Sequence, residues 1–167
     1  MSQSEDELFN SSVVPYKILV LCVGNTCRSI MYQSMYEQMY NTKQFKNKYN
    51  TVIYSGGFEV KEDNFSDESL SILKANDIPL SKQSPNSYLD YKDIHFDEII
   101  LLDEKYNKDD LKDFSYKNLK TQHVRDPKDM FKIEYLRTFA YIYSYLERNT
   151  DRFDKLNIKT PTENIPY

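Results

Sequence analysis

The sequence predicts a single α/β domain built on a parallel sheet with both faces covered. Short apolar runs of strand length alternate along the chain with segments whose apolar residues recur at helical spacing. Two of the runs, residues 16–22 and 96–103, are apolar at most positions, as expected for strands buried on both faces. The length of 167 residues fits one domain. In such sheets ligands bind beyond the carboxyl ends of the strands, so a site is expected there.

The N-terminal half predicts two strands and two helices. Polar residues 1–12 predict a disordered tail before a domain that spans 13–158. The first strand, 16–22, leads through a short turn to a helix that starts at Ser29. The elements expected next are a polar stretch (41–50), a second strand (51–54) stopped by Ser55-Gly56-Gly57, a helix capped by Ser66 and ending near Asn76, and a loop (79–88).

The C-terminal half predicts two further strands and one long helix. The expected elements are a third strand (96–103), a short helix (109–114), a weaker fourth strand (119–124), a turn at Arg125-Asp126-Pro127 and a helix (131–149). Residues 159–167 predict a frayed tail.

Composition and charge exclude several functional classes. The net charge of -4 does not give the basic surface that nucleic-acid binding requires, and no apolar run is long enough to cross a membrane. The N-terminal segment resembles neither a signal peptide nor a myristoylation site, which predicts a cytoplasmic protein. The two cysteines, Cys22 and Cys27, give no disulfide framework. His95 and His123 stand at no metal-ligand spacing, so no metal or other cofactor is expected.

The chemistry is expected between the first strand and the first helix, in the segment Cys22-Val23-Gly24-Asn25-Thr26-Cys27-Arg28-Ser29. A short loop curled against a helix N-terminus points its backbone N–H groups inward and forms a nest for a tetrahedral oxyanion. We expect Gly24 to let this backbone turn without a Cβ clash. Arg28 would close the ring, because its planar fork donates two parallel hydrogen bonds to phosphate oxygens. The same positive field favours the thiolate of Cys22, which predicts a nucleophile at that position.

These residues resemble the signature of the low-molecular-weight protein tyrosine phosphatases, Cys-x-Gly-Asn-x-Cys-Arg-Ser near the N-terminus, and match it at every specified position. The resemblance extends more loosely over residues 17–147, and includes Ser55-Gly56-Gly57 and Asp126-Pro127. It implies a flavodoxin-like single domain with four parallel strands flanked by helices on both faces. It also implies hydrolysis of phosphotyrosyl proteins or small aryl phosphates, with phosphate and vanadate as inhibitors.

The resemblance further implies a role for each matching residue. Cys22 would attack phosphorus to form a phosphocysteine, Arg28 would hold the equatorial oxygens, and Ser29 would stabilise the thiolate. Asp126 would protonate the leaving phenolate and then activate water. Cys27 would pair with an oxidised Cys22, which makes the protein redox-sensitive. The loop residues expected to bind the phosphate group are Val23, Gly24, Asn25, Thr26 and Cys27, with Asn25 also bracing the loop.

Several positions depart from the family pattern and bear on substrate choice. The departures are Ile30 in place of a proline, Thr26 in place of an apolar residue, Lys128 and Asp129 in place of aromatic residues after Asp126-Pro127, and a loop (80–84) without the usual histidine. Phe131 is the nearest aromatic substitute after the Asp-Pro pair. Phe58 is expected either to stack on the substrate ring or, equally, to pack against the domain.

The main alternative is a catalytically weak or inactive module that binds phosphorylated partners on the same fold. It stays open because the residues after Asp126 are altered, and function must be argued from the site rather than from the fold. Arsenate reductases of this type need further cysteines that the chain lacks, and sugar phosphotransferase subunits with a similar loop lack the arginine found here as Arg28.

Overall fold

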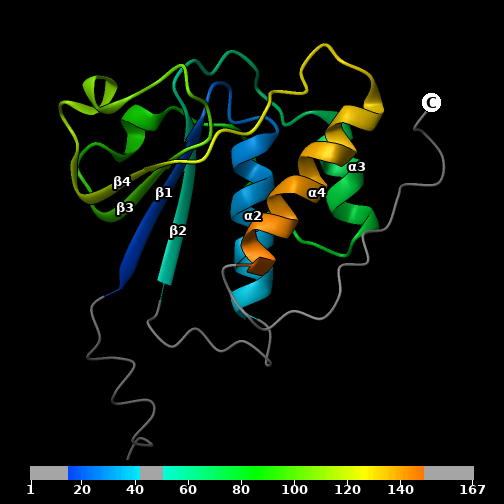
Figure 1. The fold of residues 1–167 in the computed structure, drawn as a ribbon, viewed down its shortest axis with the longest axis horizontal. Coiled ribbons are helices and arrows are strands. Elements are labelled where there is room, and N and C mark those ends of the chain that lie inside the picture. The colour runs from blue at the N-terminus through cyan, green and yellow to red at the C-terminus, as the bar shows by residue number, and fades with distance from the viewer. Residues whose placement is uncertain (1–14, 42–50, 149–167) are drawn as a thin grey trace, which may run out of the picture.

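The computed structural model describes residues 15–41 and 51–148, with the elements labelled as in Figure 1. The predicted tails 1–12 and 159–167, and nearly all of the polar stretch 41–50, lie outside the described residues. The elements are β1 (Tyr16–Cys22), α2 (Arg28–Asn41), β2 (Thr51–Gly57), α3 (Asp67–Ala75), the 3-10 helix η1 (Tyr88–Tyr91), β3 (His95–Leu101), the 3-10 helix η2 (Lys108–Leu111), β4 (Ser115–Thr121) and α4 (Lys132–Arg148).

The four strands form one parallel sheet in the order β2-β1-β3-β4, which confirms the predicted fold class. Side chains of β1 alternate between the two faces, with Val20 and Cys22 in one hydrophobic cluster and Leu19 and Leu21 in the other. Because β1 lies between β2 and β3, the loop that follows Cys22 is flanked by the carboxyl ends of both neighbours. This topology brings three separate parts of the sequence to one edge of the sheet.

The two faces of the sheet are covered by different structures. The helices α2, α3 and α4 gather on one side (Figure 1), where Met31, Ile72 and Phe139 pack in the cluster that includes Val20. The other face is covered by loops and by the two 3-10 helices, which contribute mainly aromatic side chains. The prediction of helices on both faces is therefore confirmed, but on this face the helices are the short 3-10 helices η1 and η2. The link between β3 and β4, residues 102–114, is near the minimum length for a parallel crossover and contains only η2.

The boundaries of β2, β3 and β4 differ from those expected, and β3 ends at Leu101 rather than at residue 103. β2 runs through Gly57 instead of stopping at Ser55, because its parallel pairing with β1 continues to Cys22 opposite Gly57. β4 starts at Ser115 and ends at Thr121, so the buried Val124 lies in the segment after the strand. η1 was not predicted. No helix in the described part of the chain is long and apolar enough to cross a membrane.

Candidate active site

The loop between β1 and α2 closes around the sulfur of Cys22. The backbone N–H of Asn25 donates to Cys22 Sγ at 3.3 Å, and the Ser29 hydroxyl oxygen lies 3.0 Å from the same sulfur. All three residues are almost fully buried. α2 begins at Arg28, so its N-terminus directs backbone N–H groups and partial positive charge toward the loop. The Asn25 N–H, the Ser29 hydroxyl and the α2 N-terminus thus all face the sulfur of Cys22.

The tight turn of the loop is made by Asn25 and not by Gly24. Asn25 has a φ of 56°, in the left-handed region that asparagine tolerates better than most residues. Gly24 does not have a positive φ, and a Cβ there would meet only Thr26, at 3.7 Å. The reason predicted for Gly24 is therefore wrong. Gly57 is the glycine that the loop requires, because a Cβ there would lie 2.7 Å from the carbonyl oxygen of Val23.

The side chain of Asn25 fixes the orientation of Ser29. Asn25 Nδ2 donates to Ser29 Oγ at 2.6 Å and to Ser55 Oγ at 3.1 Å. Because the Ser29 oxygen accepts from Asn25, the hydroxyl hydrogen of Ser29 is available to donate to Cys22. Ser55 in turn donates to Gln33 on α2 at 2.6 Å. β2 and α2 together thus hold the hydroxyl that contacts the sulfur.

Arg28 is only 2% exposed and keeps its charge through three oxygen partners. Its Nη1 donates to Asp103 Oδ2 and to the carbonyl oxygen of Val124, both at 2.8 Å, and its Nη2 lies 3.3 Å from Asp126 Oδ2. Burial lowers the pKa of Arg28, but the negative charges of Cys22 and the two carboxylates outweigh it and raise the pKa above its ordinary value. Burial raises the pKa of Asp103, yet the hydrogen bond from Arg28 brings it below its ordinary value.

The loop forms the floor of a cavity of about 70 Å³, which suits a group of phosphate size. The lining residues are Cys22, Val23, Gly24, Thr26, Cys27, Arg28, Glu59, Lys61, Glu62, Asp126 and Lys128. Asp126 has a side chain that is 41% exposed, so it is reachable from the cavity while it contacts Arg28. The structure thus brings the predicted nucleophile, anion-binding arginine and acid together in one place.

Other predicted residues lie outside the cavity. Asn25, within the loop, and Ser29, in the first turn of α2, do not line the cavity but contact Cys22 Sγ. Phe58 stacks on Tyr106 with 3.9 Å between ring centroids, which is the packing alternative given for it. Phe131 is 81% exposed and does not line the cavity either. Among the residues that the structure describes, no aromatic side chain lines this cavity.

Cys27 lines the cavity next to the nucleophile but is almost fully buried. Burial raises the pKa of Cys27 to about 12, so it is a neutral thiol at physiological pH. A cysteine that resolves an oxidised partner attacks as the thiolate. This environment therefore slows a reaction between Cys27 and an oxidised Cys22, and the redox pairing stays a prediction.

Lys82, in the loop after α3, is a site residue that the sequence analysis missed. Its Nζ donates to Asn25 Oδ1 at 2.5 Å, to the carbonyl oxygen of Ser55 at 2.6 Å, and to Asn86 Oδ1. By holding the amide oxygen of Asn25, Lys82 points the amide nitrogen at Ser29. The available signal was the loop without the usual histidine, where a lysine stands among residues 80–84.

The charge of Lys82 also acts on the nucleophile. Burial lowers the pKa of Lys82 to about 8, and the negative charge of Cys22 offsets part of that shift. Lys82 is therefore mostly protonated at neutral pH and places a cation near the thiolate. As the pH rises through about 8, the ammonium loses its proton and the positive charge beside Cys22 is lost.

We expect Lys82→Met to lower kcat for an aryl phosphate about tenfold or more, because small errors in catalytic geometry are costly. The pH profile of kcat should also lose its alkaline limb near pH 8. Lys74→Met, which changes an exposed lysine on α3, serves as the control. A Lys82→Met protein with the wild-type kcat and pH profile would show that Lys82 has no positioning role.

The arrangement defines a class of protein, an α/β domain with a cysteine and an arginine in a phosphate-binding loop after the first strand of a parallel sheet. The family model of the low molecular weight phosphotyrosine protein phosphatases matches residues 17–158. The chain belongs to this family, which supports a phosphatase hydrolase. A search of curated protein sequences found no match.

Solved structures with the same fold have different stated activities. A low molecular weight phosphotyrosine phosphatase from Vibrio cholerae O395 is 23% identical with a TM-score of 0.67, and the alignment covers 81% of this chain and 95% of that one. The YwlE arginine phosphatase from Geobacillus stearothermophilus is 19% identical with a TM-score of 0.64, covering 82% and 92%. An arsenate reductase from Archaeoglobus fulgidus is 21% identical with a TM-score of 0.61, covering 81% and 99%. These likenesses show the fold alone.

Proposed function

We propose that this protein hydrolyses phosphotyrosyl proteins or small aryl phosphate monoesters through a phosphocysteine intermediate. The observation that carries the proposal is the position of Cys22 Sγ, 3.0 Å from Ser29 Oγ, on the floor of a cavity that Arg28 and Asp126 also line. Positive groups and hydrogen-bond donors there face the place where a phosphate would bind. Inhibition by phosphate and vanadate is part of this proposal, and the cytoplasmic location stays a prediction.

In the first step the Cys22 thiolate attacks phosphorus in line with the ester oxygen. The S–P bond forms as the P–O bond breaks, and the leaving phenolate takes a proton from Asp126. Asp126 must therefore carry a proton when the substrate binds, and it becomes a carboxylate as the phenol leaves. Arg28 donates to the equatorial oxygens, and its hydrogen bond to Asp103 keeps the guanidinium oriented.

In the second step a water molecule attacks the phosphocysteine. Asp126, now a carboxylate, accepts the proton from water as the O–P bond forms and the S–P bond breaks. The thiolate of Cys22 leaves and is again stabilised by Ser29 and by the N–H of Asn25. Inorganic phosphate then dissociates, and the site returns to its starting state.

The acid role of Asp126 is tested with two leaving groups. We expect Asp126→Asn to lower kcat/KM, which reports formation of the phosphocysteine, about 10²–10⁴-fold with phenyl phosphate and much less with p-nitrophenyl phosphate, because nitrophenolate needs little protonation. Asp129→Asn is the control, since Asp129 is exposed and does not line the cavity. An equal loss with both substrates, or no loss, would remove Asp126 from the acid role.

A second candidate substrate class is phosphoarginine. The cavity is lined by Thr26, by the carboxylates Glu59 and Glu62, and by no aromatic residue of the described chain. Carboxylates complement a guanidinium, whereas a tyrosyl ring gains most from apolar or aromatic walls. We expect a higher kcat/KM with phosphotyrosine peptides than with phosphoarginine peptides, and the reverse order would select the second class. Phosphate binding without turnover of either would select the binding module.

A further inference from the structure

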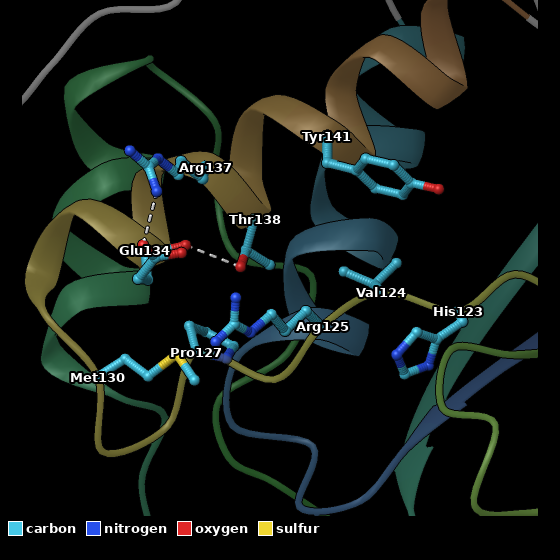
Figure 2. Close-up of a pocket in the computed structure, with 9 residues that line it drawn as sticks. All are labelled: His123, Val124, Arg125, Pro127, Met130, Glu134, Arg137, Thr138 and Tyr141. Carbon is cyan, nitrogen blue, oxygen red and sulfur yellow. Dashed lines mark hydrogen bonds and ion pairs between the residues drawn. The ribbon is translucent and has the colours of Figure 1, made fainter.

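A second cavity, of about 340 Å³, borders the segment that carries Asp126 (Figure 2). Its walls come from the segment between β4 and α4 and from the part of α4 between Glu134 and Tyr141. The volume lies within the range of about 300–1,000 Å³ that is typical of small-molecule sites. None of its lining residues lines the cavity that contains Cys22.

Successive side chains of the shared segment alternate between the two cavities. Arg125 and Pro127 line the second cavity, whereas Asp126 and Lys128 line the catalytic one. The two sets of neighbouring side chains thus face opposite sides of this segment. The same stretch of chain is therefore a wall of both cavities. A group bound in the second cavity would contact the two residues directly bonded to Asp126.

Most of the second cavity's surface is apolar. Val124 and Pro127 are buried at its base, and Met130 and Tyr141 are partly exposed along its sides. The Tyr141 hydroxyl accepts a hydrogen bond from Gln122 at 2.6 Å, which holds the ring in place as an aromatic face. These surfaces suit a flat apolar group that packs between them.

Two arginines, Arg125 and Arg137, line this cavity. Glu134 and Arg137 pair with each other at 2.8 Å across one turn of α4 (Figure 2). Arg125 forms no ion pair with any carboxylate in the described part of the chain. Figure 2 shows its side chain extending across the cavity toward Pro127. The cavity thus combines apolar walls with a single uncompensated positive charge, which favours a ligand with one anionic group.

We propose that the second cavity binds a small organic acid with a flat apolar body and one carboxylate, and that its occupancy restrains Asp126. The apolar body packs on Val124, Pro127 and Tyr141, and the carboxylate pairs with Arg125. A bound acid fixes the shared segment and limits the approach of Asp126 to the leaving oxygen. The binding stands independently, whereas the effect on Asp126 rests on the proposed function.

Binding is tested by calorimetric titration of 2-naphthoate into the full chain with vanadate saturating the catalytic cavity. We expect saturable binding that Arg125→Gln weakens about tenfold, and 2-naphthamide, which lacks the charge, to bind about tenfold more weakly. Lys132→Gln changes a cation at the start of α4 that does not line the cavity, and it should leave the affinity unchanged. No saturable binding, or binding that Arg125→Gln leaves intact, would overturn the proposal.

The effect on Asp126 is tested by kinetics without vanadate. We expect 2-naphthoate to lower kcat/KM about fivefold with phenyl phosphate and much less with p-nitrophenyl phosphate, since only the former leaving group depends strongly on protonation. The effect should disappear in Arg125→Gln. Binding with unchanged kcat/KM for phenyl phosphate would refute the coupling. If the protein turns over neither substrate, the proposed function fails, and the titration still decides whether the second site exists.

Discussion

Cys22→Ser is expected to abolish phosphatase turnover, with a loss of at least about 10⁴-fold in kcat. The serine hydroxyl would keep the hydrogen bond with Ser29, but it would remain a neutral alcohol, which is a far weaker nucleophile than a thiolate. The anion site is built from backbone N–H groups and Arg28, which this substitution leaves in place. Phosphate affinity, measured by calorimetry, should therefore stay within a few-fold of wild type.

Cys27→Ala provides the matched comparison for this experiment. It alters the other cysteine of the same loop and leaves the sulfur of Cys22 with its contacts to Asn25 and Ser29. We expect this variant to retain turnover. Measurable hydrolysis by Cys22→Ser at a rate near that of wild type would mean that Cys22 is not the nucleophile.

Arg28→Lys is expected to lower kcat/KM by about 10²–10³-fold, although it conserves the charge. Lysine cannot donate two parallel hydrogen bonds to phosphate oxygens, and removing one donor from a preorganised oxyanion site costs a loss of this size. The substitution also gives up the present contacts of the guanidinium with Asp103, Val124 and Asp126 at the same time. A single ammonium group cannot reach all three from the same buried position.

Stability is measured alongside activity for this variant. Disturbing a buried ion pair with Asp103 costs up to about 3–5 kcal/mol of unfolding free energy, so thermal unfolding must be recorded before kcat/KM is interpreted. Arg137→Lys, an exposed arginine on α4, gives the matched charge-conserving control. An Arg28→Lys protein that folds and keeps kcat/KM within tenfold of wild type would contradict the role assigned to the guanidinium.

The features that could be predicted from the sequence are those whose residues lie close together along the chain. The strand before Cys22, the helix after it and the matching residues between them are neighbours in sequence, so their spacing alone predicts a phosphate-binding loop. The alternation of apolar runs with segments of helical periodicity was sufficient to predict the parallel sheet. The sequence did not predict that β2 extends to Gly57, because glycine weakens the interior of a strand. Here a glycine is needed at position 57, because the backbone packs closely against the carbonyl oxygen of Val23.

The remaining site residues depend on contacts between distant segments. Lys82 contacts Asn25, which is 57 positions away in the sequence, and Asp103 contacts Arg28, which is 75 positions away. No local pattern distinguishes Lys82 or Asp103 from a charged surface residue. The carboxyl edge of the sheet brings them together, since β1 lies between β2 and β3. The second cavity could not be predicted from the sequence either, because it depends on how α4 packs beside the segment that carries Asp126.

The central claim is that Cys22 carries the phosphoryl group during turnover. The most direct measurement mixes Asp126→Asn with excess p-nitrophenyl phosphate, whose leaving group needs little protonation, stops the reaction in denaturant within the first turnovers, and locates any added phosphoryl group by mass spectrometry. Since this variant cannot activate water well, the intermediate should accumulate. We predict one phosphoryl group per chain, on Cys22, and none in a Cys22→Ser protein treated in the same way. Continued release of phosphate with no phosphorylated Cys22, or a phosphoryl group on another residue, would contradict the account.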